Sequence, residues 1–79
     1  MRPTRLPAAN TLEQADKDAV LAALRGSPRA ALELVVELDG MALGIYLAID
    51  ALLDEGLIEQ APGGLWRLTA AGKKQAERL

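Results

Sequence analysis

Apolar residues recur at helical spacing in three segments of the chain. The first segment runs from about Thr11 to Arg25, and either Asn10 or Thr11 can begin it through a capping box with the residue three positions later. The second covers about Ala31 to Leu38, and the third about Met41 to Glu55. This pattern predicts three helices packed around an aliphatic core. Their inner stripes are Val20, Leu21 and Leu24, then Ala31, Leu34, Val35 and Leu38, then Met41, Ile45, Ala48, Ile49 and Leu52.

Glycine and proline mark the ends of these helices. Gly26 follows the first helix as a C-cap glycine, and Gly56 ends the third. Ser27-Pro28 can begin the second helix, because serine caps an N-terminus and proline is tolerated in the first turn. A short extended piece at Arg29–Ala30 before that helix is equally compatible with the sequence. The start of the second helix therefore stays open between these two arrangements.

Two short apolar segments after the third helix predict a hairpin. Residues 57–60 and 65–68 are typical of strands, and residues 61–64, Ala-Pro-Gly-Gly, are typical of a tight turn between them. Trp66 is expected to pack between this hairpin and the third helix. Thr69 then caps a last helix over 70–79. The expected fold class is mainly α with a small β-hairpin (α+β). We expect a flexible N-terminal arm over residues 1–9 and a single domain over residues 10–79.

Three short motifs in this arrangement carry a family resemblance. Glu33-Leu34 opens the second helix, Gly56-Leu57-Ile58 leads from the third helix into the hairpin, and residues 66–72 have the sequence Trp-Arg-Leu-Thr-Ala-Ala-Gly. Together they resemble a winged helix-turn-helix domain of the kind found in MarR- and PadR-like bacterial transcriptional regulators, over about residues 17–79. The resemblance implies three helices, a two-stranded wing and a C-terminal helix. It also implies DNA binding, with the third helix as the recognition helix.

Charge is unevenly distributed along the chain. The 79 residues have a formal net charge of −2. Residues 1–29 hold five bases and three acids, and residues 67–79 hold four bases and one acid. Nucleic-acid binding draws most of its affinity from cations placed against phosphates. The third helix, which the resemblance identifies as the recognition helix, lies in an acidic segment. Residues 30–66 hold no Lys or Arg and seven acids, which are Glu33, Glu37, Asp39, Asp50, Asp54, Glu55 and Glu59.

The exposed face expected for the third helix offers few groups that contact DNA. Base readout uses hydrogen-bond donors and acceptors, and phosphate contacts use cations. The residues of this face are Ala42, Leu43, Gly44, Tyr46, Leu47 and Asp50, with no cation among them. If the chain binds double-stranded DNA, its phosphate contacts must therefore come from Arg2, Arg5, Ser27, Arg29 and Arg67. Lys73-Lys74 on the last helix is interpreted as a solvated face.

Several apolar residues lie off the predicted core stripes, namely Leu32, Val36, Leu43 and Leu47. Exposed apolar patches often mark protein contacts, so we expect part of this set to be covered by a second copy of the chain or by another protein. Two functions remain open. The first, which the resemblance favours and which we expect, is a DNA-binding transcriptional regulator that acts as a monomer or a homodimer. The alternative is a winged-helix protein-interaction module that does not bind DNA, which the charge distribution favours.

Composition excludes several kinds of site. The chain has no cysteine and no histidine, so it lacks thiolate metal ligands and the commonest general base. Asp50 and Asp54 lie one turn apart, but without a histidine or a metal they are interpreted as solvated charges. We therefore expect no enzymatic activity, no catalytic residue, no cofactor and no metal. No apolar run has the length of a signal peptide or a membrane span, so we expect a cytoplasmic protein without membrane contact.

Overall fold

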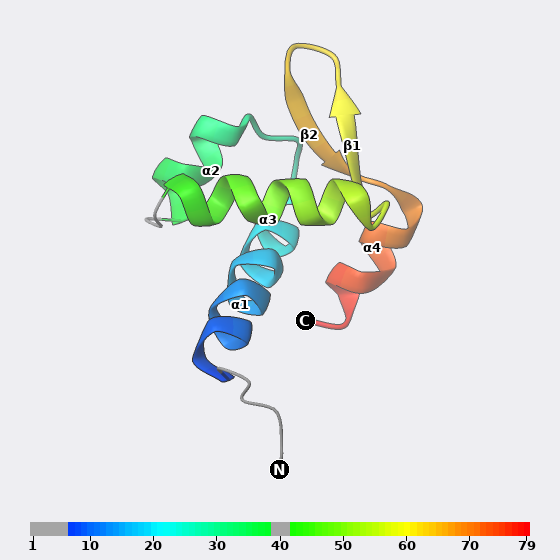
Figure 1. Cartoon of the computed structure of the whole chain (residues 1–79). Coiled ribbons are helices and arrows are strands. Elements are labelled where there is room, and N and C mark those ends of the chain that lie inside the picture. Colours follow the sequence, from blue (N-terminus) through cyan, green and yellow to red (C-terminus); the bar gives the residue numbers. More distant parts are fainter. Residues whose placement is uncertain (1–6, 39–41) are drawn as a thin grey trace.

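The computed structural model describes residues 7–38 and 42–79, with side chains from Gln14 onward. Within these ranges the chain forms a small α+β domain with four helices and one antiparallel hairpin, in the predicted order (Figure 1). In Figure 1, α3 crosses in front of α1, α2 lies at one end of α3, and the hairpin projects beside the other. The elements are α1 (Pro7–Leu24), α2 (Ala31–Leu38), α3 (Ala42–Asp54), β1 (Ile58–Ala61), β2 (Leu65–Leu68) and α4 (Ala70–Glu77).

The core is aliphatic and draws on all six elements. Leu34 of α2 and Leu52 of α3 are fully buried, with 0% of each residue exposed. Trp66 is partly buried and packs against this cluster. The spacing of apolar residues along a helix selects one face for burial, and the predicted stripes are confirmed where the structure describes them, with Ala31, Val35 and Leu38 only partly buried. Met41 lies outside the described residues. The buried apolar residues are Val20, Leu21, Leu24, Leu34, Ile45, Ala48, Ile49, Leu52, Ile58, Leu68 and Ala76.

Helix α1 differs at both ends from the prediction. It begins at Pro7, so residues 7–9 belong to the helix and not to the arm, and the rest of the predicted arm lies outside the described residues. Proline fits the first turn, where its missing N–H has no helical acceptor. Asn10 and Thr11 lie inside α1 and cannot cap it. The helix ends at Leu24, and Gly26 does not adopt the left-handed conformation of a C-cap glycine.

The segment before α2 is extended, so the second of the two arrangements is correct. The backbones of Arg29 and Trp66 exchange two hydrogen bonds, of 3.0 and 2.7 Å. These bonds join the segment before α2 to the hairpin. The N-terminus of α2 is then capped by Glu33, whose carboxylate accepts a 2.8 Å hydrogen bond from the Ala30 N–H. Ser27-Pro28 lies upstream in the loop and does not begin the helix.

The end of α3 is a Schellman motif. The N–H of Leu57 donates to the Leu52 carbonyl at 2.9 Å, and the N–H of Gly56 donates to the Leu53 carbonyl at 3.1 Å. This pattern requires a left-handed residue just after the helix, and Gly56 has a φ of 74°. The predicted stop at Gly56 is therefore confirmed, with α3 ending one residue earlier than expected, at Asp54.

The hairpin pairs Ile58 with Leu68 and Ala61 with Leu65. Strand β1 lies one residue later than predicted, whereas β2 has the predicted bounds. Gly63 and Gly64 turn the chain with φ of 84° and 74°.

Thr69 is the N-cap of α4, as predicted. Its Oγ1 accepts a 3.0 Å hydrogen bond from the Gly72 N–H and donates a 2.7 Å bond to the Gly56 carbonyl. One side chain thus joins the end of α3 to the start of α4. Helix α4 ends at Glu77, before the predicted end at Leu79. None of the helices in the described residues combines the length and hydropathy that crossing a membrane requires.

Candidate interaction surfaces

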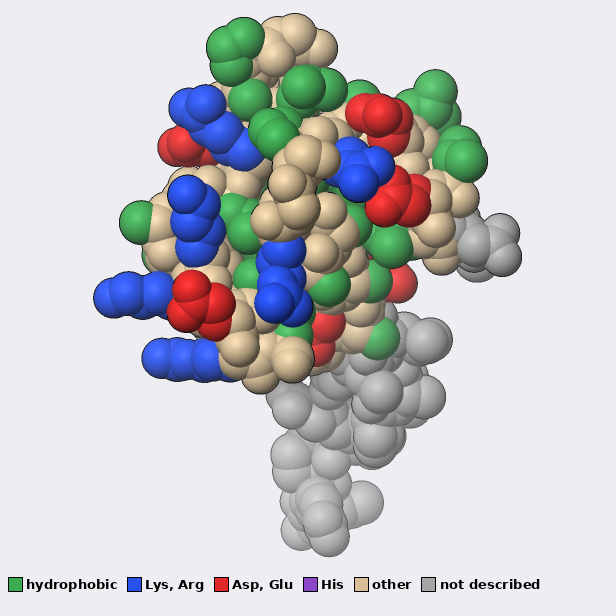
Figure 2. Space-filling view, turned by 180° about the vertical axis from the view of Figure 1, so that it is seen from behind, with side chains coloured by type: hydrophobic (Ala, Val, Ile, Leu, Met, Phe, Trp, Pro, Cys, Tyr) green, Lys and Arg blue, Asp and Glu red, His purple; other side chains and the backbone are tan. Residues whose placement is uncertain are grey.

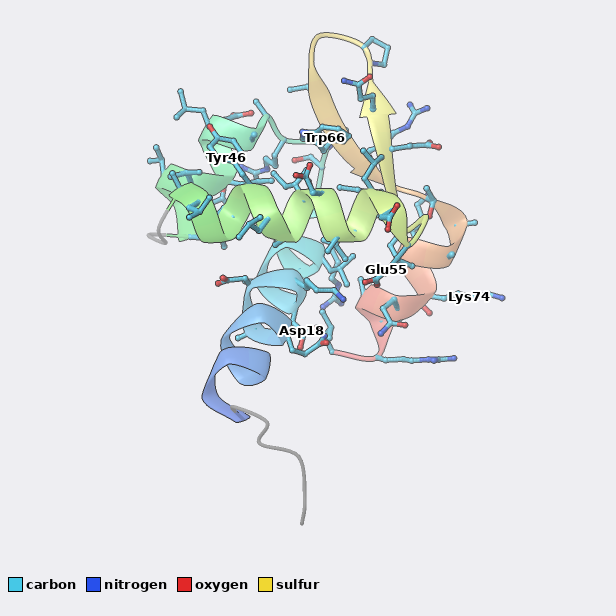
Figure 3. All side chains as sticks on the ribbon, in the orientation of Figure 1. Asp18, Tyr46, Glu55, Trp66 and Lys74 are labelled. Atoms are coloured by element: carbon cyan, nitrogen blue, oxygen red, sulfur yellow. The ribbon has the colours of Figure 1, made fainter. Side chains whose placement is uncertain are left out.

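The outer face of α3 is exposed and carries apolar and acidic side chains. Leu43 and Leu47 are 67% and 57% exposed. Successive helical residues are rotated by roughly 100°, so Asp50 and Asp54 share this side of the helix. In Figure 3, Tyr46 rises from α3 on the side of α2. The predicted face is confirmed as exposed except at Gly44, which is half-buried.

Gly44 lies at a hollow between α1 and α3. The hollow has a volume of about 260 Å³ and is lined by Asp16, Gly44, Leu47 and Ala48. A Cβ atom at Gly44 would lie 2.8 Å from a carboxylate oxygen of Asp16. The Asp16 carboxylate therefore takes up part of the space that a side chain at position 44 would need, and it lines the hollow together with Leu47.

The exposed apolar residues of α2 form a separate surface. Leu32 and Val36 are 67% and 74% exposed, and they line a second hollow with Ala30, Glu33 and Glu37. The two hollows share no lining residue, with Leu47 at the one beside Gly44 and Leu32 and Val36 at the one on α2. Sequence analysis missed Leu53, which is 44% exposed, although helical spacing places it on the same flank of α3 as Tyr46.

Both described arginines on the predicted list of phosphate contacts are paired with acids. The guanidinium of Arg29 donates to Glu37 at 2.5 Å, and the Nε of Arg67 donates to Glu59 at 2.8 Å. The predicted phosphate site at the start of the second helix also holds the Glu33 carboxylate. Ser27 is exposed in the loop, whereas Arg2 and Arg5 lie outside the described residues.

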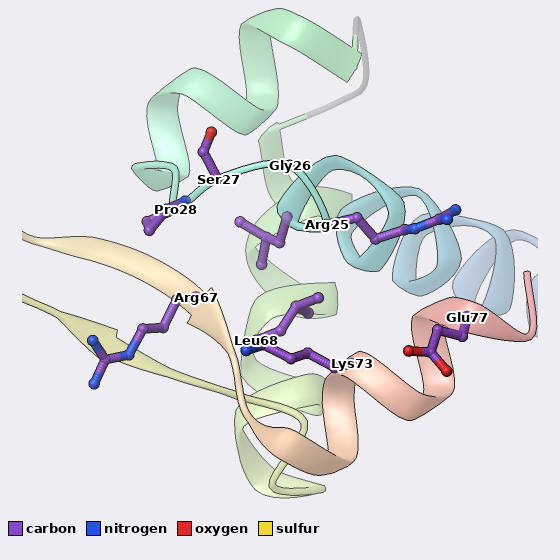
Figure 4. A pocket seen from close by; sticks show the side chains of 9 residues that line it. Arg25, Gly26, Ser27, Pro28, Arg67, Leu68, Lys73 and Glu77 are labelled. Atoms are coloured by element: carbon purple, nitrogen blue, oxygen red, sulfur yellow. The ribbon is translucent and has the colours of Figure 1, made fainter.

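Four other cations form no ion pair within the described ranges: Arg25, Lys73, Lys74 and Arg78. Figure 2 shows Lys and Arg side chains gathered along one side of the molecule, seen from behind the view in which α3 is in front. On this side Arg25 and Lys73 line a hollow of about 510 Å³ (Figure 4). The sequence does not predict this cluster, because Arg25 is remote in the chain from Lys73, Lys74 and Arg78.

The acidic side chains of the described residues do not converge on a candidate metal site. Within the described residues, no group of three or more Asp or Glu side chains is placed to hold a metal ion. Asp50, Ala51, Leu53 and Asp54 line a shallow surface hollow on α3, in which the two carboxylates are the charged groups. Comparisons with family models, curated proteins and solved structures gave no match to this chain.

Proposed function

We propose that this chain is a winged helix-turn-helix domain that acts as a protein-interaction module. In this reading α2 and α3 are the helix-turn-helix, β1 and β2 are the wing, and the outer face of α3 binds a partner helix. That partner presents apolar side chains flanked by lysine or arginine. The backbone bridge between Arg29 and Trp66 supports the assignment of the wing, because it joins the segment before α2 to strand β2 of the hairpin.

The observation that carries the proposal is the charge of the exposed α3 face. Leu43 and Leu47 lie one turn apart with Asp50 and Asp54 on the same side, and residues 30–66 contain no Lys or Arg. Apolar anchors at i and i+4 suit contact with a second helix. The two carboxylates have no ion-pair partner among the described residues. They therefore attract a cationic partner and repel phosphate.

A second copy of the chain fits this surface less well than a basic helix. Two-fold pairing through α3 would bring the acids of one copy to the acids of the other, and neither α2 nor α3 offers a cation to separate them. Like charges brought together across an interface are destabilising. We expect the hollow beside Gly44 to accept one side chain of the partner, with the Asp16 carboxylate among its lining residues.

Peptide binding tests this proposal. The probes are a synthetic amphipathic helix with a leucine stripe flanked by lysines, and the same helix flanked by glutamates, each followed by fluorescence anisotropy. We expect tighter binding of the lysine helix, and a Kd raised about tenfold or more by Leu47→Glu. The double variant Asp50→Lys/Asp54→Lys should reverse the preference. Val36→Glu, on α2, is the matched control and should leave Kd unchanged.

Three outcomes would contradict the proposal. Equal binding of both peptides would show that the carboxylates of Asp50 and Asp54 do not select a cationic partner. An equal effect of Val36→Glu and Leu47→Glu would show that binding is not specific to α3. A dimer detected by light scattering and disrupted by Leu47→Glu would identify the occupant as a second copy.

DNA binding is a second candidate function, namely the transcriptional regulator that the resemblance implies. The observation that favours it is the placement of Arg29 and Arg67, because Arg29 is bridged to Trp66, the residue before Arg67 in β2. Their ion pairs are partly exposed, and exposed ion pairs contribute at most about 1 kcal/mol each. DNA phosphates can therefore replace Glu37 and Glu59 as partners of these two arginines.

Titration of labelled duplex DNA separates this candidate from the first. With four arginines available as phosphate contacts, the log–log salt dependence should have a slope of roughly −3 to −4, at about 0.9 per contact. Arg29→Ala and Arg67→Ala should each weaken binding and reduce that slope. DNA binding that is unchanged in both variants, or no binding at low salt, would contradict recognition through the hairpin and α3.

A further inference from the structure

We propose that a basic face formed by Arg25, Lys73, Lys74 and Arg78 binds the sugar–phosphate backbone of nucleic acid. These four residues come from the end of α1 and from α4, and none belongs to the surface proposed above for a partner helix. In the described ranges the ion pairs take up Lys17, Arg29 and Arg67. The cations that are left without an acidic partner all belong to this face.

A hollow brings cations from three elements around one space. Arg25 follows α1, Arg67 lies on β2 and Lys73 lies on α4, and Ser27 supplies a hydroxyl at the edge of the hollow. Glu77 is the one acid among the lining residues. In Figure 4 the Lys73 side chain extends from α4 toward β2, whereas the Arg25 side chain extends away from β2. The positive charges are therefore spread across the hollow. Cations that bind a single small anion would converge on one point, and these do not.

The positive surface continues beyond the hollow. Lys74 on α4 and Arg78, the C-cap residue of α4, are exposed, and Lys74 points away from the body of the protein in Figure 3. A row of separated cations suits a chain of phosphates, because each lysine or arginine neutralises a different phosphate. Of the apolar residues that line the hollow, Leu24 and Leu68 are buried, and Pro28, the smallest of the three, is exposed. The hollow therefore presents no large apolar side chain for insertion into a lipid surface.

This proposal is independent of the α3 surface, because the two faces carry opposite charge and share no residue. The acids of the α3 face repel phosphate, so nucleic acid on the basic face leaves α3 available for its partner. Backbone contacts of this kind carry no sequence information. We therefore expect binding to random and to native sequences with the same affinity.

Fluorescence anisotropy with a labelled random-sequence duplex, using the full chain at low and physiological salt, tests the proposal. The variant Lys73→Gln/Lys74→Gln should weaken binding about tenfold and reduce the magnitude of the log–log salt slope by about 2, at about 0.9 per lost contact. The matched control Lys17→Gln/Arg29→Gln also removes two positive charges, but from ion-paired residues that do not line the hollow, and should change Kd less than about twofold. Circular dichroism verifies that both variants are folded.

Any of the following results would overturn the proposal. Equal weakening by the two double variants would indicate a response to net charge alone. If only the control variant bound duplex DNA more weakly, the DNA-binding site would lie at the hairpin and α3 and not on the basic face. Polyglutamate that competes as well as unlabelled duplex would identify an acidic polymer, and not nucleic acid, as the ligand class. Leu47→Glu should leave DNA binding unchanged, so failure of the α3 proposal and failure of this one are separate results.

Discussion

The Ile49→Ala variant will lose about 2–5 kcal/mol of unfolding free energy, because truncation of a buried isoleucine leaves a cavity that its neighbours fill only in part. Ile49 lies at the middle of α3 and is 3% exposed. A domain of this size has a total stability of roughly 4–12 kcal/mol. The substitution therefore removes a large part of the stability, and the variant will be partly unfolded at moderate temperature.

Urea denaturation followed by circular dichroism measures this loss. Ile49→Val should fall between wild type and Ile49→Ala, at a cost of about 0.5–1.5 kcal/mol. Leu53→Ala, on the same helix but 44% exposed, is the control and should cost clearly less than Ile49→Ala. A loss below about 1 kcal/mol for Ile49→Ala would mean that the face of α3 assigned to the core is wrong.

Replacement of Gly72 by alanine will also destabilise the fold, although alanine favours helix. A Cβ atom at Gly72 would lie 1.9 Å from the carbonyl oxygen of Leu57. That oxygen belongs to backbone held on both sides, since the Leu57 N–H donates to Leu52 and the Leu57 carbonyl accepts from Thr69. Helix α4 must therefore move away from the end of α3. Overpacking of this kind costs about 1–3 kcal/mol, which outweighs the roughly 1 kcal/mol that alanine gains over glycine in a helix.

The sign of the change in stability tests this account. Gly26→Ala is the matched control, because a Cβ atom there meets no atom within 4 Å and the backbone is not left-handed. The control should change stability by less than about 0.5 kcal/mol. A Gly72→Ala variant more stable than wild type would show that α4 packs against Leu57 less closely than the geometry indicates.

Local signals account for most of the predicted fold. The core stripe of α3 follows from apolar spacing, and its end follows from Gly56, the residue that best tolerates the left-handed position of a Schellman motif. The start of α1 was predicted wrongly, because Asn10 and Thr11 are common N-cap residues and Pro7 is common in a first turn. These two local signals compete, so the contacts of the rest of the structure decide where α1 begins.

The candidate surfaces were predicted in part. Exposure of Leu43, Leu47 and Asp50 follows from helical geometry alone, and the structure agrees. Which cations have acidic partners does not follow, because it depends on residues brought together by the fold. Lys17 and Glu55 are separated by 38 positions yet form a 2.6 Å ion pair. The basic face, with Arg25 and Lys73 at one hollow, arises in the same way.

The sequence by itself determined the order of the helices and the hairpin, the aliphatic core and the acidic character of α3, because these depend on spacing and composition within short segments. Only the tertiary structure decided the pairing of Arg29 with Glu37 and of Arg67 with Glu59, and the closeness of Gly72 to Leu57. Charge pairing and steric contact act over a few ångströms, and the distance between two side chains is set by the packing of elements that are remote in the chain. The segregation of an acidic, apolar face from a basic face is therefore a property of the folded domain.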